Sequence, residues 1–210
     1  MKDKFKTEQE SFWAGEFGDE YSKRNVGNNL VASNCALFTK VFSKTRNVNS
    51  ILEFGANIGL NLEAIGMLKP EAEISALEIN ESAVKKLQKR GRYHVYNESL
   101  LNFKSDKKWD FVLIKTVLIH INPHELQKVY DVLVSSSKRY ICIAEYYNRT
   151  PVSINYRGHD ERLYKRDFVG ELLDKFPSLT LVDYGFVYHR DPNFPQDDIT
   201  WFLLEKLENM

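Results

Sequence analysis

The stretch SILEFGANIGLN, residues 50–61, decides the fold. A β-branched and apolar run stops at Glu53, and Gly55 and Gly59 follow it four residues apart. Because glycine has no Cβ, these positions permit a tight turn from a strand into a helix and a close approach by a ligand. The stretch therefore predicts a buried strand, a ligand-binding turn and a helix, in that order.

Strand-like and helix-like segments alternate after this turn, which predicts a parallel sheet with helices on both faces. We expect strands at residues 49–54, 72–79, 93–97, 109–117, 139–147, 179–190 and 199–207. We expect helices at residues 8–24, 27–44, 59–69, 81–90, 123–137 and 165–176. The last two strands have no helix between them, so the seventh should pair antiparallel beside the sixth. The expectation is one α/β domain over residues 1–210, with an N-terminal helical lid (1–46) and a Rossmann-like core of seven strands (47–210).

Composition excludes several classes of protein. Lys plus Arg and Asp plus Glu number 29 each in 210 residues. This balance argues against a general nucleic-acid binder, which needs an excess of cations. No apolar run is long enough to span a bilayer, and the charged start lacks a signal-type apolar region. Two cysteines far apart in apolar stretches predict buried thiols rather than a disulfide, so we expect a cytoplasmic protein with no membrane partner.

The glycine turn does not have the G-x-G-x-x-G spacing of a dinucleotide site, because Asn57 stands where a second glycine would admit a pyrophosphate. A ligand with an ammonium and a carboxylate suits it better, and S-adenosylmethionine is such a ligand. Glu53 would compensate its positive end, and backbone N–H groups near Gly55 and Asn57 would meet its carboxylate. Glu78 ends the second strand, where a carboxylate can accept both ribose hydroxyls. The alternative is that both acids are merely surface residues at strand ends.

A doubly wound sheet closed by an antiparallel hairpin is the arrangement of class I methyltransferases. Within them the chain resembles the pseudaminic acid biosynthesis-associated methylases. The resemblance is carried by FWAGEFGDEYSKRN (12–25), LEFGANIGLN (52–61), KTVLIHINP (115–123), EYYN and TPV (145–148, 150–152), YRGHDERLYKRDF (156–168) and DYGFVYHRDPNFPQDDITWFLLEK (183–206). It implies methyl transfer from S-adenosylmethionine to a nonulosonic acid, its CMP-activated form or a precursor, in bacterial surface-glycan biosynthesis. O- or N-methylation and the oligomeric state stay open.

Ligands of open parallel sheets lie beyond the carboxyl ends of the strands, so by analogy with the fold the first three loops hold the cofactor. The expected cofactor-binding residues are Tyr21, Arg24, Glu53, Gly55, Asn57, Gly59, Glu78, Ile79, Ser99, Leu100 and Lys115. Tyr21 and Arg24 come from the aromatic N-terminal block, which would fold over the cofactor as a lid. The alternative for this block is an extra helix packed on the core.

The later loops should face the methyl acceptor. His120, His159 and His189 are candidate general bases, because histidine titrates near neutrality; the alternative for each is a hydrogen-bonded structural role. Arg157, Arg162 and Tyr188 are candidate acceptor-binding residues, since arginine pairs with carboxylate or phosphate in a two-point manner. A solvated charge run is the alternative for the arginines.

Three further alternatives concern one loop and the function of the whole protein. The acids of residues 191–198 could bind a metal, but proline-stiffened capping explains the same residues, and we expect no metal. A non-catalytic cofactor-binding partner of the sugar pathway is the second functional reading. A nicotinamide-dependent reductase is disfavoured by the glycine spacing and by the lack of a suitably placed Tyr-x-x-x-Lys pair.

Overall fold

A computed structural model of the chain describes residues 5–25 and 27–207. Parts of two expected segments, residues 1–4 and 26 of the lid and 208–210 of the core, lie outside the described residues. The main sheet has seven strands in the order β3-β2-β1-β4-β5-β9-β8. These strands are β1 (Ser50–Phe54), β2 (Glu73–Glu78), β3 (His94–Asn97), β4 (Trp109–Lys115), β5 (Ser137–Glu145), β8 (Leu179–Val187) and β9 (Ile199–Lys206).

The sheet confirms the expected fold class. Strands β1 to β5 pair in parallel. Strand β9 lies between β5 and β8 and is antiparallel to both. The seventh strand therefore pairs antiparallel beside the sixth, as the missing helix between them predicts.

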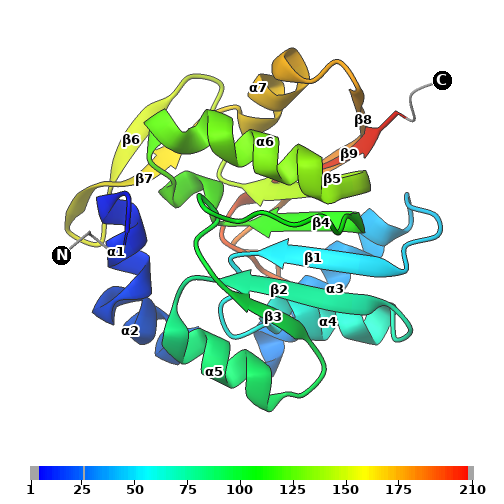
Figure 1. Cartoon of the computed structure of the whole chain (residues 1–210), viewed down its shortest axis with the longest axis horizontal. Helices are drawn as coiled ribbons and strands as arrows, with labels where there is room; N and C mark the ends of the chain where they lie inside the picture. Colours follow the sequence, from blue (N-terminus) through cyan, green and yellow to red (C-terminus); the bar gives the residue numbers. More distant parts are fainter. Residues whose placement is uncertain (1–4, 26, 208–210) are drawn as a thin grey trace.

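Helices cover both faces of this sheet (Figure 1). They are α3 (Asn28–Phe42), α4 (Leu60–Leu68), α5 (Glu81–Lys89), α6 (Leu126–Ser136) and α7 (Phe168–Lys175), with short 3-10 turns η1 (Leu118–His120) and η2 (Pro123–Glu125). Strand β1 is buried along its whole length. Its Leu52 and Phe54 pack in a cluster with α6 and α7, whereas Ile51 packs in a second cluster with α3 and α4. Because side chains of a strand alternate between its two faces and both faces are covered here, apolar residues occur at successive positions 51 and 52.

The segment after β5 is not the loop that we expect from the sequence. It forms a separate two-stranded antiparallel sheet of β6 (Val152–Tyr156) and β7 (His159–Lys165). Arg157 and Gly158 form its turn, and both have positive φ, 53° and 86°. Tight hairpins require this conformation, and Arg-Gly is a weaker signal for it than Asn-Gly. Because β7 runs to Lys165, helix α7 begins at Phe168 instead of residue 165.

The expected helix at residues 8–24 is also corrected, because it is divided into α1 (Glu8–Ala14) and α2 (Glu16–Arg24). Thr7 and Glu10 form a capping box that starts α1. Gly15 has an extended backbone and separates the helices. Gly18 then lies so close to the carbonyl of Trp13 that a Cβ would overlap it, so the two helices can turn against each other only with glycine there.

The two helices and the β6–β7 hairpin lie together beyond the carboxyl ends of the parallel strands (Figure 1). Gln9 Nε2 donates to the carbonyl of Glu161 at 3.1 Å, and Arg162 pairs with Glu8 at 2.9 Å. The lid and the hairpin therefore form one continuous cover over this edge. Across residues 5–25 and 27–207, no helix has the length and apolar character needed to cross a membrane.

Candidate active site

A cavity of about 810 Å³ lies under this cover, at the carboxyl edge of the sheet. Its wall comes from the loops after the first five parallel strands of the core, from α1 and α2, from the hairpin and from the loop before β9. Nine of the fourteen non-histidine residues that the sequence proposes for the site line this cavity: Tyr21, Gly55, Asn57, Glu78, Ile79, Ser99, Leu100, Lys115 and Arg157.

The glycine turn is held by backbone hydrogen bonds. Gly55 N–H and Ala56 N–H both donate to the carbonyl of Leu77, at 2.8 and 3.1 Å. Gly55 has φ of 71°, and a Cβ there would overlap the side chain of Val117. Asn57 also has positive φ, 47°, which asparagine tolerates better than most residues. The turn thus brings the β1 and β4 loops into contact, as the spacing of the glycines allows.

Glu53 lies under the floor of the cavity. Its Oε1 accepts from Asn61 Nδ2 at 2.6 Å, whereas Oε2 is buried without a partner. Burial raises the pKa of Glu53 to about 8, although the Asn61 hydrogen bond and the charge of Lys115 oppose this shift. Asn61 and Lys115 line the cavity themselves. A cationic ligand above them would stabilise the ionised carboxylate that burial disfavours.

Glu78 lines the cavity directly and is fixed at both oxygens. Oε2 accepts from Asn57 N–H and Oε1 from Asn80 N–H, each at 2.7 Å. Burial raises the pKa of this carboxyl against those hydrogen bonds. Each oxygen keeps a second lone pair, so the carboxylate is oriented and can still accept hydrogen bonds from a ligand's hydroxyl groups.

The lid contacts each of the three loops on this side of the cavity. Ser22 Oγ donates to Asn57 Oδ1 at 2.6 Å, and Asn80 Nδ2 donates to Asp19 Oδ1 at 3.0 Å. Ser99 Oγ donates to Glu10 Oε1. Glu10, Asp19, Ser22 and Asn80 are functional candidates that sequence reasoning missed, because contacts between residues so far apart leave no pattern in a single sequence.

The cavity also has an aromatic wall around His120. Trp13 and Tyr156 flank the imidazole with ring centroids at 4.5 and 5.0 Å, and Tyr21 packs edge-on against Trp13 at 5.2 Å. The carbonyl of Arg162 lies 2.6 Å from His120 Nδ1. A carbonyl can only accept, so Nδ1 carries the proton and Nε2 is left as an acceptor.

Burial lowers the pKa of His120 to about 4, although the hydrogen bond to the Arg162 carbonyl opposes this shift. The imidazole is therefore neutral at physiological pH. Among the described residues, Nε2 has no hydrogen-bond partner, and the side chain lines the cavity. This arrangement can accept a proton from a group bound in front of it.

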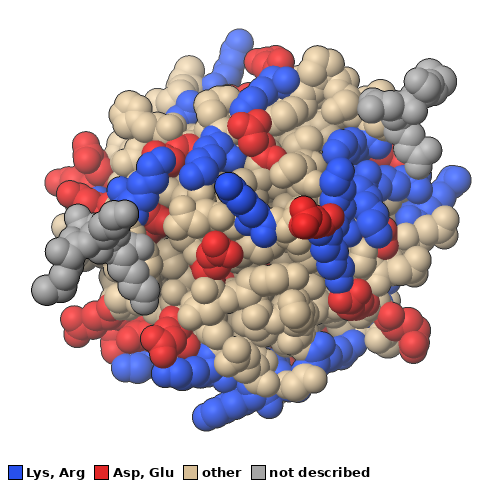
Figure 2. Space-filling view, viewed as in Figure 1, with Lys and Arg blue, Asp and Glu red and all other residues tan. Residues whose placement is uncertain are grey.

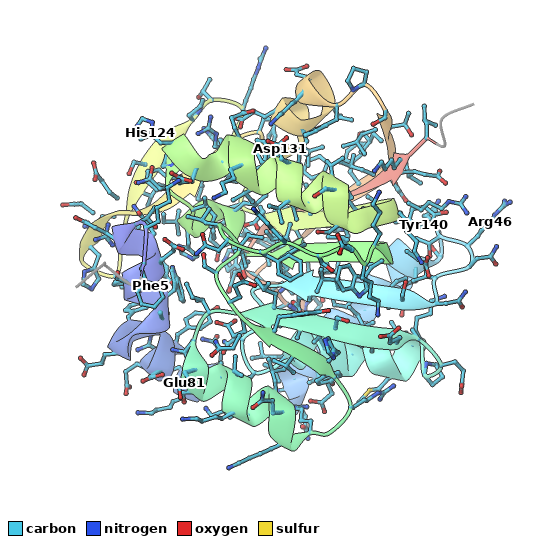
Figure 3. The ribbon with its side chains drawn as sticks, in the orientation of Figure 1. Phe5, Arg46, Glu81, His124, Asp131 and Tyr140 are labelled. Carbon is cyan, nitrogen blue, oxygen red and sulfur yellow. The ribbon has the colours of Figure 1, made fainter. Side chains whose placement is uncertain are left out.

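The other two candidate histidines lie differently. His189 lines the cavity, is exposed, and its Nδ1 lies 2.8 Å from Asp198 Oδ2. His159 is exposed at the start of β7, packs against Phe12 and Phe17, and does not line the cavity. Their catalytic roles stay predictions. His124, which sequence reasoning sets aside, is exposed on η2 at the outer surface (Figure 3).

Several predicted binding residues lie outside the cavity lining. Arg162 is held by its ion pair with Glu8 and packs over Phe12, and Arg24 packs over Phe17. Tyr188 is exposed beside His189. Gly59 lies behind the turn, next to Leu87. Arg157 does line the cavity, stacks on Tyr156 and has no ion pair in the described part of the chain.

The surface charge is mixed. On the face in Figure 2, Lys and Arg side chains lie among Asp and Glu side chains. Within the described ranges, no group of three His, Cys, Asp or Glu residues could hold a metal ion. Asp191 instead accepts from the N–H groups of Asn193 and Phe194, and Asp198 from that of His189. The capping alternative for these acids is thus observed. Both cysteines are free thiols; Cys142 is buried and Cys35 is half-buried.

Comparison with known proteins identifies the fold. No protein-family model and no curated protein matches the sequence. Solved structures do match. Magnesium protoporphyrin IX methyltransferase from Synechocystis PCC 6803, with bound SAM, is 14% identical with a TM-score of 0.67, covering 95% of this chain and 98% of its own. 1,6-Didemethyltoxoflavin-N1-methyltransferase from Burkholderia thailandensis is 14% identical with a TM-score of 0.69, covering 95% and 87%.

A S-adenosylmethionine-dependent methyltransferase from Clostridium acetobutylicum is 12% identical with a TM-score of 0.65, covering 91% of this chain and 98% of its own. The protein has the fold of class I S-adenosylmethionine-dependent methyltransferases. At this level of identity the likeness shows the fold alone. The narrower resemblance to pseudaminic acid-associated methylases stays a prediction.

Proposed function

We propose that the protein is a S-adenosylmethionine-dependent methyltransferase. The observation that carries the proposal is that the glycine turn, Glu78 and the neutral His120 line one cavity. Methyl transfer needs this combination, because donor and acceptor must meet in line within a space that excludes water. Similar structures that contain SAM or S-adenosylhomocysteine support the choice of cofactor.

The residues around the glycine turn and Glu78 fit the cofactor. Its ammonium would be stabilised by the buried Glu53, whose Oε2 lacks a partner, and its ribose hydroxyls would donate to the oriented Glu78. The loop of Ser99 and Leu100 would cover the adenine. The lid would close over the cofactor through the hydrogen bonds of α1 and α2 with the loops after β1, β2 and β3.

When bound, the cofactor supplies an electrophilic methyl group on a sulfonium. His120 Nε2 would take the proton of the acceptor's O–H or N–H group as the new bond to carbon forms, and the thioether product would leave neutral. The hydrogen bond from Nδ1 to the Arg162 carbonyl stabilises the imidazolium that results. Trp13, Tyr21 and Tyr156 would keep bulk water from the reacting atoms.

The proposed acceptor is a nonulosonic acid of the pseudaminic type, its CMP-activated form or a precursor. Arg157 supports an acidic acceptor, because it is a cation at the cavity without an ion pair among the described residues. The sequence resemblance supports the same class. The proposal includes a cytoplasmic location, for which the free thiols of Cys35 and Cys142 are the support.

Calorimetry and mass spectrometry test the proposal in two stages. Purified protein should bind SAM and S-adenosylhomocysteine, and then add one methyl group to one of the pathway's sugars when incubated with SAM. Methylation of a different small molecule would leave the enzyme class standing and exclude the sugar. Cofactor binding without turnover on any pathway intermediate would favour the non-catalytic partner, and no cofactor binding would exclude the class.

A further inference from the structure

The loop between β8 and β9 has a fixed backbone on both sides of Asp197. On one side, Gln196 Nε2 donates to the carbonyl of Ser33 in α3 at 3.0 Å. On the other, Asp198 Oδ1 accepts from the backbone N–H of His189 at 2.9 Å, and Ile199 is buried. Asp197 is thus held between two anchored neighbours.

The Asp197 carboxylate takes no part in folding this loop. Asp191 and Asp198 both accept backbone hydrogen bonds within it. Asp197, by contrast, has neither a hydrogen bond nor an ion pair among residues 5–25 and 27–207. It lines the cavity and is exposed to solvent. An anchored residue with an unused charged group facing a cavity is typical of a ligand-binding position rather than a structural one.

The charge of Asp197 acts on three groups that also line the cavity. Burial raises the pKa of Tyr21 to about 12, and the charge of Asp197 adds to this shift. Asp197 also adds to the rise in the pKa of Tyr146 that burial causes. For Lys115, burial lowers the pKa, and Glu53 and then Asp197 oppose that shift. No ion pair joins Asp197 to Lys115 among the described residues, and both line the cavity.

We infer that Asp197 binds hydroxyl or amino groups of the methyl acceptor and thereby selects acceptors that carry such donors. The inference rests on the proposed methyltransferase function and deepens it. A carboxylate only accepts hydrogen bonds, so its natural partners are O–H and N–H groups. Tyr21 and Tyr146, whose hydroxyls can also form hydrogen bonds, line the same cavity.

Selectivity follows from desolvation. An acceptor that fills this space displaces water from Asp197, and one without a donor there leaves the carboxylate unpaired. Sites of this kind reject analogues that lack the matching group far more strongly than apolar pockets reject a missing methylene. The space beside Asp197 therefore suits a ring with hydroxyl or amino groups better than an apolar molecule. An acidic group on the same ring would pair with Arg157.

The test compares Asp197→Asn with Asp191→Asn. Asparagine keeps the shape of Asp197 and loses the charge and one acceptor oxygen. The control changes the same group in the same loop, and asparagine there can still accept the two backbone hydrogen bonds. For Asp197→Asn we expect S-adenosylhomocysteine affinity within twofold of wild type and an acceptor KM raised by about tenfold to a hundredfold, with a smaller change in kcat. Asp191→Asn should match wild type in all three.

The probes are pseudaminic acid, CMP-pseudaminic acid, N-acetylneuraminic acid and glucosamine, each assayed for turnover with SAM and for binding to the S-adenosylhomocysteine complex. If wild type methylates a nonulosonic acid and Asp197→Asn has the same KM, the inference is overturned while the proposed function stands. If wild type methylates none of them yet binds one in a manner that Asp197→Asn weakens, the inference stands and the acceptor class is wrong. If none of the four probes binds or reacts, the inference about Asp197 and the proposed acceptor class are both overturned.

Discussion

Replacing Glu53 by glutamine tests whether the buried carboxyl serves ligand binding at the expense of stability. Its pKa is raised from an ordinary value of 4.5 to about 8, chiefly by burial. An acid whose pKa is higher in the folded chain binds more protons when folded. The carboxyl therefore lowers the free energy of unfolding by a growing amount as pH rises from the unfolded pKa toward 8. The penalty is below about 1 kcal/mol at pH 5 and on the order of 3 kcal/mol at pH 7.

Glutamine removes this penalty because it does not ionise, and Asn61 Nδ2 can still donate to its Oε1. Allowing for an unpaired amide where Oε2 now lies, we expect Glu53→Gln to stabilise the ligand-free protein by about 1–3 kcal/mol at pH 7. The gain at pH 5 should be below about 1 kcal/mol. The assay is denaturant unfolding at both pH values, with SAM calorimetry on the same protein.

The matched control is Glu63→Gln on α4, whose carboxylate forms a partly exposed ion pair with Arg90. It should change the free energy of unfolding by no more than about 1 kcal/mol at either pH. We expect Glu53→Gln, but not the control, to weaken SAM binding at least tenfold. Equal stability of Glu53→Gln and wild type at pH 7, or unchanged SAM affinity, would refute the reasoning.

Three other changes test separate parts of the site. Gly55→Ala should cost on the order of 1–3 kcal/mol and weaken SAM binding, because its positive φ and the contact with Val117 leave no room for a Cβ; adding Val117→Ala should recover part of the unfolding energy, and no recovery would argue against the contact. His120→Asn should lower turnover by about 10²–10⁴ at unchanged SAM affinity. With a pKa of about 4, His120 should impose no fall in the wild-type rate between pH 7 and 5, so a decline centred near 6.5 that disappears in His120→Asn would contradict its environment. Asp19→Ala removes the lid's hydrogen bond from Asn80 and should raise the SAM Kd several-fold while making α1 and α2 easier to proteolyse; unchanged values of both would mean that this contact does not hold the lid.

The sequence predicts the core of the fold because local pattern and burial agree there. Strand β1 is largely apolar and is buried on both faces, and the glycine turn follows it at the sheet edge. The final pair of strands lacks an intervening helix, which leaves antiparallel pairing as the simple solution. Gly55, Asn57 and Glu78 reach the cavity as expected because the ends of parallel strands always meet at one edge.

What the sequence does not predict depends on contacts between distant segments. The β6–β7 hairpin is rich in charged residues and turns through Arg157-Gly158, so it reads as a solvated loop. Arg162 was expected at the acceptor, but the hairpin turns its guanidinium toward Glu8 of the lid. The hydrogen bonds of the lid to the loops after β1, β2 and β3 likewise join residues dozens of positions apart. No local periodicity encodes such pairs.

The most direct test of the central claim is a titration of S-adenosylhomocysteine into wild type and into Glu78→Gln. In the variant the amide oxygen can accept from only one of the Asn57 and Asn80 N–H groups, and both the charge and one oxygen that could accept from the ribose hydroxyls are lost. Saturable binding at one site per chain in wild type, weakened about tenfold to a hundredfold in the variant, is the predicted result. The absence of heat with wild type, or equal affinity in the two proteins, would contradict the assignment of this cavity to the cofactor.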